Sequence, residues 1–146
     1  MDSEIIYQAL FDRLSNVQGM VSVSRRLKTF NQVYNEQRPA LFVTQGNQAE
    51  NPVKGLNAKI ILSADLYLYV YEADPVKAIS TQINTFVDAI RDAIKPDFPE
   101  ICEYQTLNGL VEHCWIDGTI EVYEGIDGML DGQGIAIIPV QILTTN

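Results

Sequence analysis

The segment from Ala58 to Glu72 constrains the fold of this chain more than any other stretch. Its odd and even positions separate chemically, and a period of two indicates a β-strand, whose successive side chains point to opposite faces of a sheet. One face is aliphatic and consists of Ala58, Ile60, Leu62, Ala64, Leu66, Leu68 and Val70. The other face is amphipathic and carries Lys59, Ile61, Ser63, Asp65, Tyr67, Tyr69 and Tyr71. The aliphatic face predicts a covering layer of helices.

The length of this strand bears on how copies of the chain meet. At roughly 3.3 Å per residue the segment extends about 45 Å. A compact chain of 146 residues has a diameter of roughly 38 Å. We therefore expect the strand to reach the edge of the domain or to pass it. A long strand with one wet, aromatic face also suggests contact between subunits.

The composition places the chain among ordinary globular proteins. With 146 residues and 47% hydrophobic residues it is expected to form a single domain over residues 1–146. Its net charge of −9 opposes binding to phosphate backbones, so no specific nucleic-acid binding is expected. The start of the chain is acidic where a signal peptide would be basic, and no apolar run reaches the roughly 20 residues that span a bilayer. We expect a soluble protein, made in a reducing cytoplasm, with no membrane partner.

Two helices are predicted from apolar residues at helical spacing. The first covers residues 2–17, with Asp2 or Ser3 as its cap, and the second runs from the Asp74-Pro75 start signal to the stop at Pro96. Their apolar stripes consist of Ile6, Leu10, Leu14 and Val17, and of Ile79, Ile83, Val87, Ile90 and Ile94.

The other predicted strands cover residues 20–28, 40–45, 110–124 and 135–145, and the loops cover residues 29–38, 46–57, 96–108 and 125–134. The resulting order is α-β-β-β-α-β-β. Strands joined by hairpins favour an α+β fold: a mostly antiparallel sheet of four to five strands with two helices packed on one face.

Two residues mark irregular points in the last two strands. Asp117-Gly118 is either a hairpin turn or a kink in one long strand, and the shared parity of Ile116 and Ile120 favours the kink. Pro139 places the last strand at a sheet edge, or requires a bulge there.

No residue pattern predicts catalysis, a cofactor or a metal. The single histidine, His113, has no nucleophile elbow near it and reads as a packed or surface residue. Cys102 and Cys114 form neither a disulfide framework nor a zinc-ligand pair. Asp127 and Asp131 lack the spacing and closing glutamate of a calcium loop. No catalytic, cofactor-binding or metal residues are therefore assigned, and no enzyme activity is expected.

Two features suggest contacts between protein chains. Arg25 and Arg26 are an unusual pair on a strand of so acidic a chain, and they either meet acids of a neighbouring subunit or form a solvated strand edge. Tyr67, Tyr69 and Tyr71 form a ladder that lies either at a subunit interface, where tyrosine is enriched, or across strands within one subunit.

Several stretches resemble the tail terminator, or tail-completion, proteins of long-tailed bacteriophages and prophages, the group typified by the lambda minor tail protein U. The stretches that carry the resemblance touch most of the chain; they are VSRRL at 23–27, RPALFVTQG at 38–46, LSADLYLYVY at 62–71, STQINTFVDAI at 80–90, QTLNGLVEHCWIDGTIEVYEG at 105–125 and AIIPVQIL at 136–143. These stretches belong to predicted strands, helices and turns, and none of them contains a catalytic signature.

The resemblance implies a structural protein of the virion that closes into a hexameric ring on the tail tube, stops tube polymerisation and presents a surface to the head-neck connector. The implied partners are copies of itself, the tail tube protein and the connector, at the head-proximal end of the tail. We expect Arg25, Arg26, Tyr67, Tyr69 and Tyr71 at the ring interface. Two mobile loops are expected to dock on tube or neck through Asn47, Glu50, Lys54, Asp127, Met129 and Asp131.

Three alternative functions remain open from the sequence. Within virion parts, the alternative is a neck or head-closure connector protein that binds the portal side. In a different class, the chain is a small α+β ligand-binding domain or enzyme, which requires a concave pocket with converging polar groups. The third alternative is a regulatory module of a bacterial host.

Overall fold

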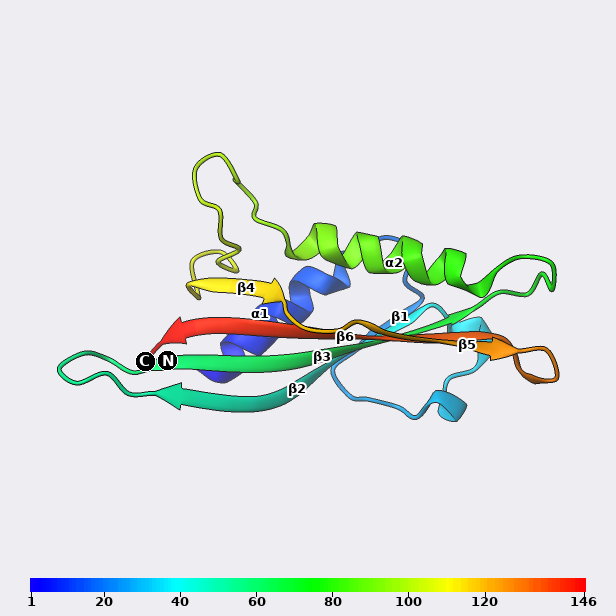
Figure 1. Ribbon diagram of the computed structural model, residues 1–146, viewed down its shortest axis with the longest axis horizontal. Helices are drawn as coiled ribbons and strands as arrows, with labels where there is room; N and C mark the ends of the chain where they lie inside the picture. Colours follow the sequence, from blue (N-terminus) through cyan, green and yellow to red (C-terminus); the bar gives the residue numbers. More distant parts are fainter.

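The computed structural model describes residues 1–146 and has the expected α+β class (Figure 1). The helices are α1 (Ser3–Ser15) and α2 (Ile79–Ile94). The strands are β1 (Ser22–Ser24), β2 (Ala40–Asn51), β3 (Lys59–Tyr71), β4 (His113–Ile116), β5 (Glu121–Ile126) and β6 (Met129–Thr145). Two short 3-10 turns, η1 (Phe30–Gln32) and η2 (Asn35–Gln37), lie between β1 and β2.

All six strands belong to one sheet, in the order β1-β2-β3-β6-β4, with β5 also paired to β6. Every pairing is antiparallel except that of β1 with β2. The predicted sheet had four to five strands; the sixth arises because one predicted strand is interrupted and forms both β4 and β5.

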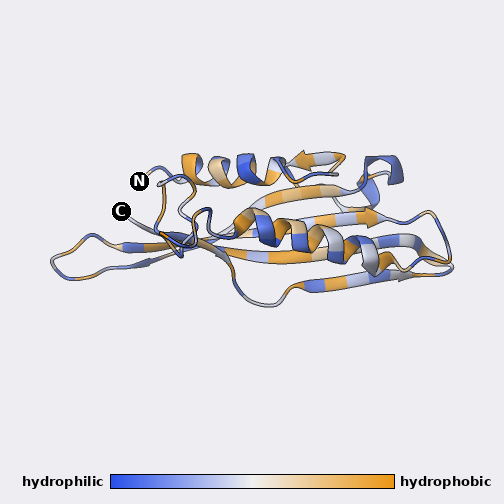
Figure 2. Ribbon diagram, turned by 90° about the horizontal axis from the view of Figure 1, so that it is seen from above, coloured by the Kyte–Doolittle hydropathy of each residue, from blue (hydrophilic) through white to orange (hydrophobic).

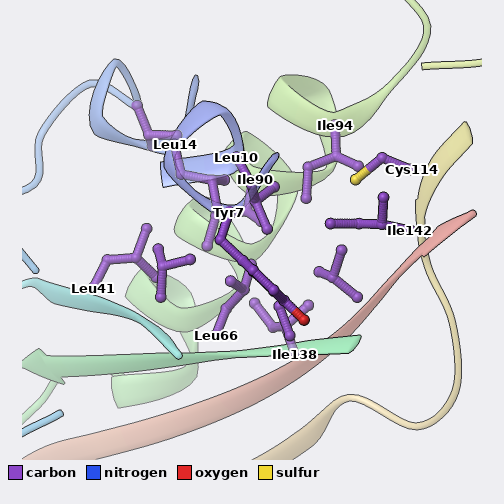
Figure 3. Packing of buried hydrophobic residues seen from close by; sticks show 14 of the residues in the cluster. Tyr7, Leu10, Leu14, Leu41, Leu66, Ile90, Ile94, Cys114, Ile138 and Ile142 are labelled. Carbon is purple, nitrogen blue, oxygen red and sulfur yellow. The ribbon is translucent and has the colours of Figure 1, made fainter. Parts of the chain in front are cut away.

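Both helices pack on one face of the sheet, as the aliphatic face of β3 predicts (Figure 1 and Figure 2). Along β3 the residues from Ile60 to Val70 at even positions are buried against the helices. The ring of Tyr7 on α1 also reaches the sheet, and its hydroxyl donates to the carbonyl of Ser63 at 2.9 Å. Figure 3 shows this core, in which residues of both helices meet β2, β3, β4 and β6.

The predicted strand 20–28 is too long. Only Ser22–Ser24 is a strand, and it pairs parallel to β2. After Ser24 the backbone turns, with the N–H of Arg26 donating to the Ser24 hydroxyl at 3.0 Å. Residues 25–39 then carry the chain back to the start of β2, and a connection of this length permits a parallel pair.

Helix α2 begins four residues after the expected Asp74-Pro75 start. Asp74 instead caps a turn, where its carboxylate accepts from the N–H of Val76 at 3.0 Å. The residue before the helix, Ala78, offers no side-chain cap. A carboxylate from β5 replaces it: Glu124 accepts from the N–H of Ser80 at 2.8 Å. The start of α2 therefore depends on a contact distant in sequence.

The two predicted loops are largely strand. Residues 46–51 extend β2 past a register shift between Gln45 and Gln48, so the connection to β3 covers only residues 52–58. Residues 125–134 form a β5–β6 hairpin in which Ile126 pairs with Met129 around Asp127-Gly128. Glycine and polar residues predicted loops, but residues 46–51 and most of residues 125–134 pair in the sheet, which leaves residues 52–57 and the turn at Asp127-Gly128 outside the strands.

Pro139 is neither at a sheet edge nor in a bulge of its own strand. It lies within β6, which pairs continuously with β3 from Gln133 to Thr145. Its carbonyl accepts from the N–H of Asp117, just past the end of β4, so its nitrogen, which lacks a hydrogen, faces the same side. On that side β4 ends at Ile116 and β5 begins at Glu121. A hairpin at Asp117-Gly118 is excluded, because both strands run along β6 in one direction. The favoured single strand is nevertheless interrupted over residues 117–120.

Candidate assembly interface

The face of the sheet turned away from the helices has only a partial cover. It carries aliphatic, aromatic and polar side chains, among them Tyr67 of β3, Ile137 and Gln141 of β6, Trp115 of β4 and Tyr123 of β5, as their shared register positions show. Most of these side chains are half-buried or exposed. No helix packs on this side, which leaves a broad mixed surface.

The segment between β1 and β2, residues 25–39, covers one part of this face. Tyr69 is 3% exposed there, with its ring 5.2 Å from that of Phe30 and 5.3 Å from that of Phe42, and its hydroxyl donates to the carbonyl of Lys28 at 2.8 Å. Burial raises the pKa of Tyr69. The structure thus places Tyr69 inside its own subunit, where it is closed to a partner.

Arg38 holds the same segment against the sheet through hydrogen bonds. It is 7% exposed, its guanidinium lies 4.1 Å from the centre of the Phe30 ring, and it donates to the carbonyls of Phe30, Val33 and Val70. Burial lowers the pKa of Arg38, and carbonyl dipoles rather than a carboxylate hold its charge. Sequence analysis missed this residue, because nothing in its local pattern marks a buried arginine.

The two adjacent arginines have different surroundings. Arg25 pairs within the chain, with Glu4 of α1 at 2.7 Å and with Gln8 at 3.1 Å. Arg26 is exposed and forms no ion pair. Arg26 is therefore the residue of this pair that is available to another molecule.

Tyr67 and Tyr71 are both half-buried, on the same face as Tyr69. Tyr67 lies opposite Phe42 of β2 and Ile137 of β6, near the middle of the sheet. Tyr71 lies opposite Gln133, where β6 leaves the hairpin. The structure places the three tyrosines along one face, with only Tyr67 and Tyr71 in part accessible.

The predicted docking residues lie in two groups at opposite ends of the long axis (Figure 1). The first group belongs to the β2–β3 hairpin: Asn47 and Glu50 on β2, and Lys54 in the connection. The second belongs to the β5–β6 hairpin: Asp127 in the turn, and Met129 and Asp131 at the start of β6. All six are exposed.

Charge is segregated along the chain. All ten Lys and Arg residues lie at or before Lys95, together with ten of the nineteen acids. Residues 96–146 hold the other nine acids and no Lys or Arg, so they account for the whole net charge of −9. This part includes β4, β5 and β6. Sequence analysis overlooked the segregation, which counting charge by segment would have found.

The two free edges of the sheet also expose apolar side chains. At the β5 edge these are Val122, Tyr123 and Ile126, which are 46%, 55% and 66% exposed. Beside β1 they are Val21 and Leu27, 58% and 43% exposed. Exposed apolar side chains also lie in the loops, with Val76 at 90% and Ile101 at 88%. Those at the edges differ in standing beside unpaired strand backbone, which suits a surface that binds another protein.

His113 packs against a neighbouring aromatic ring and accepts a backbone hydrogen bond. Its ring stacks on that of Trp115 with centroids 4.9 Å apart, and its Nδ1 accepts from the N–H of Gln105 at 3.2 Å. Burial lowers the pKa of His113. Cys114, beside it, is fully buried in the core. No group of three or more His, Cys, Asp or Glu side chains is arranged to hold a metal ion.

An open groove of about 710 Å³ lies between α1 and α2. It is lined in part by Asp12, Arg13, Asn16, Asp92 and Asn108, and His113 lies outside it. Arg13 is held by Asp97 in an ion pair of 2.9 Å, which lowers the pKa of that carboxyl. Neither helix is long and apolar enough to cross a bilayer.

Comparison with known proteins gives a structural likeness only. No protein-family model matches the chain, and no curated protein matches it. Among solved structures, a chain described as "Virion of native gene transfer agent (GTA) particle" superposes with a TM-score of 0.56 and 8% sequence identity. The match covers 97% of this chain and 95% of that chain. At this identity the likeness shows the fold alone.

Proposed function

We propose that this chain is a structural protein of a phage or prophage virion that caps the tail tube as a ring. The cap stops tube polymerisation and presents a surface for joining the tail to the head and neck. The observation that carries the proposal is the fold shared along nearly the whole chain with a virion component of a gene transfer agent particle. The proposed role is assembly, without catalysis.

The shape of the molecule supports this role. A ring of identical subunits requires a heterologous interface whose rotation closes, and the sheet has a different free edge on each side, at β1 and at β4–β5. The two hairpins project at opposite ends of the long axis (Figure 1). One end is thereby available to the tube and the other to the neck, while neighbouring subunits meet side by side.

The proposed partners follow from this arrangement. Further copies of the chain, six in the ring implied by the resemblance, occupy the sheet edges. The tail tube protein and the head-neck connector meet the hairpin ends through Asn47, Glu50 and Lys54 on one side and Asp127, Met129 and Asp131 on the other. The proposed location is the head-proximal end of the tail.

The test is to polymerise tail tube protein with and without the purified chain and to measure tube lengths by electron microscopy. We expect shorter tubes, each with extra density at one end, and recovery of the chain with purified tails. The same fold would serve a neck or head-closure protein, which would instead be recovered with filled heads. Unchanged tube lengths and recovery with filled heads alone would contradict capping.

A further inference from the structure

The two free edges of the sheet carry opposite charge. Near the β5 edge, Asp117, Glu121 and Asp127 are exposed and form no ion pair within the chain. Just after β1, Arg26 and Lys28 are likewise exposed and unpaired. Of the other charged residues nearby, Arg25 pairs with Glu4 and Glu124 caps α2. Lys77 lines the same hollow as Asp127 at the hairpin end, together with Asp74 and Asp131, so acids still outnumber the one cation there.

Each edge also provides backbone and apolar contacts. β5 is paired on one side only, to β6, and β1 on one side only, to β2. Backbone groups on an unpaired strand side are a template for another strand. Val122 and Tyr123 on one edge, and Val21 and Leu27 beside the other, supply apolar area of the kind that lies at the centre of protein interfaces within a charged rim.

We propose that the acidic β5 edge of one copy docks against the basic β1 segment of the next copy. The occupant of each edge is thus a second copy of this chain, selected by charge complementarity. Two β5 edges would repel each other, and so would two β1 edges, because like charges across an interface are unfavourable. Only the head-to-tail contact remains, and such a contact forms a ring when its rotation closes.

This inference rests on the proposed function and deepens it by naming the surfaces that meet. It also explains why acids gather in residues 96–146 while the earlier part of the chain is neutral overall. Electrostatic pairing of unlike edges sets orientation and register more than it sets affinity, which is what a ring with one defined direction requires.

The test uses two charge-reversed variants of the full chain. One carries Asp117→Lys plus Glu121→Lys, and the other carries Arg26→Glu plus Lys28→Glu. Each is expected to self-associate about tenfold or more weakly than wild type, since its own edges now match in sign. An equal mixture of the two is expected to regain association, because each reversed edge then finds an unlike partner.

Two matched variants control for net charge alone. Asp88→Lys plus Asp92→Lys, on α2, changes the charge as the first variant does, and Arg91→Glu plus Lys95→Glu, at the end of the same helix, changes it as the second does. These four residues are exposed and lie outside both edges. Melting temperatures of all variants identify any that fail to fold. Sedimentation velocity over a range of concentrations then gives the association of the folded ones.

Restored association in the mixture, with little effect of the two α2 controls, supports the inference. A mixture as weak as its components, beside a wild type that forms rings, overturns the edge assignment and leaves tube capping intact. A wild type that stays monomeric at every concentration, and whose tube shortening neither charge reversal changes, overturns the inference as well. A wild type that forms rings but does not shorten tubes would instead contradict the proposed function.

Discussion

At the residue scale, the segment between β1 and β2, residues 25–39, depends most on the side chain of Arg38. We expect Arg38→Lys to lower the free energy of unfolding by roughly 1–3 kcal/mol, because a lysine cannot reach the separate carbonyls of Phe30, Val33 and Val70 with one planar fork. Urea unfolding monitored by tyrosine fluorescence measures the change. Arg91→Lys, at an exposed site on α2, should alter stability by less than about 0.5 kcal/mol; an equal effect at both positions would refute the role of Arg38.

His113 gives the chain a pH dependence separate from that of its acids. Its pKa is lowered by burial, so the unfolded state binds a proton first and stability falls as pH drops from about 6.5 through the lower folded pKa. Protonation also places a hydrogen on Nδ1, which accepts from Gln105. Ion pairs lower the pKa values of Asp97 and Glu112, so the titration of these carboxyls changes the stability only at more acidic pH.

Thermal unfolding between pH 7 and pH 5 tests this account. The wild type should melt progressively lower across this range. His113→Asn keeps an acceptor near the position of Nδ1 without titrating, and its melting temperature should stay nearly level. Because the chain has a single histidine, a parallel decline in both proteins would show that another group is responsible.

The two cysteines should differ sharply in reactivity. Burial raises the pKa of the Cys114 thiol to about 12, and Figure 3 shows its sulfur in the core near Ile94. Cys102 lies half-buried in the loop after α2. Since the thiolate is the reactive form, alkylation at pH 8 should modify Cys102 quickly and Cys114 only after unfolding. Mass spectrometry of peptides gives the order, and early labelling of Cys114 would contradict the packing.

At the scale of elements, the β5–β6 hairpin is held by close backbone contact. Gly132 has φ +70°, and a Cβ there would lie 2.2 Å from the carbonyl oxygen of Glu72. Gly55 has φ +79°, with open space around it. Gly132→Ala and Gly55→Ala therefore share the cost of a left-handed conformation, about 1 kcal/mol, and only the first adds a clash.

We expect Gly132→Ala to be the more destabilising of the two by roughly 1–3 kcal/mol. Chemical unfolding of both variants under the same conditions gives the difference. Equal stabilities would mean that the hairpin is free to move away from Glu72, and the segment would then be the mobile loop that its glycines suggested.

How far the sequence predicts these elements depends on the distance over which each is determined. β3 and both helices follow from local periodicity, because their side chains meet one core. The direction of β1, the strand character of residues 46–51 and the cap on α2 depend on partners far along the chain. The same holds at the candidate interface. The sequence identifies Arg25 and Arg26, but it does not show that Arg25 forms an ion pair with Glu4 of its own chain.

At the scale of the whole molecule, the account joins three observations. The sheet has two different free edges, the net negative charge lies in the segment that forms one of them, and the hairpins project at opposite ends. Together they describe a subunit with two sides and two ends, which suits a ring stacked between a tube and a connector.

The measurement that tests this account most directly is the mass of the particle in solution, by light scattering at several concentrations, with and without tail tubes. We expect a shift from the 16.4 kDa chain to one closed species, a hexamer, either at high concentration or on the tubes. A chain that remains monomeric in every condition, or that grows without limit into filaments, would contradict closure into a ring.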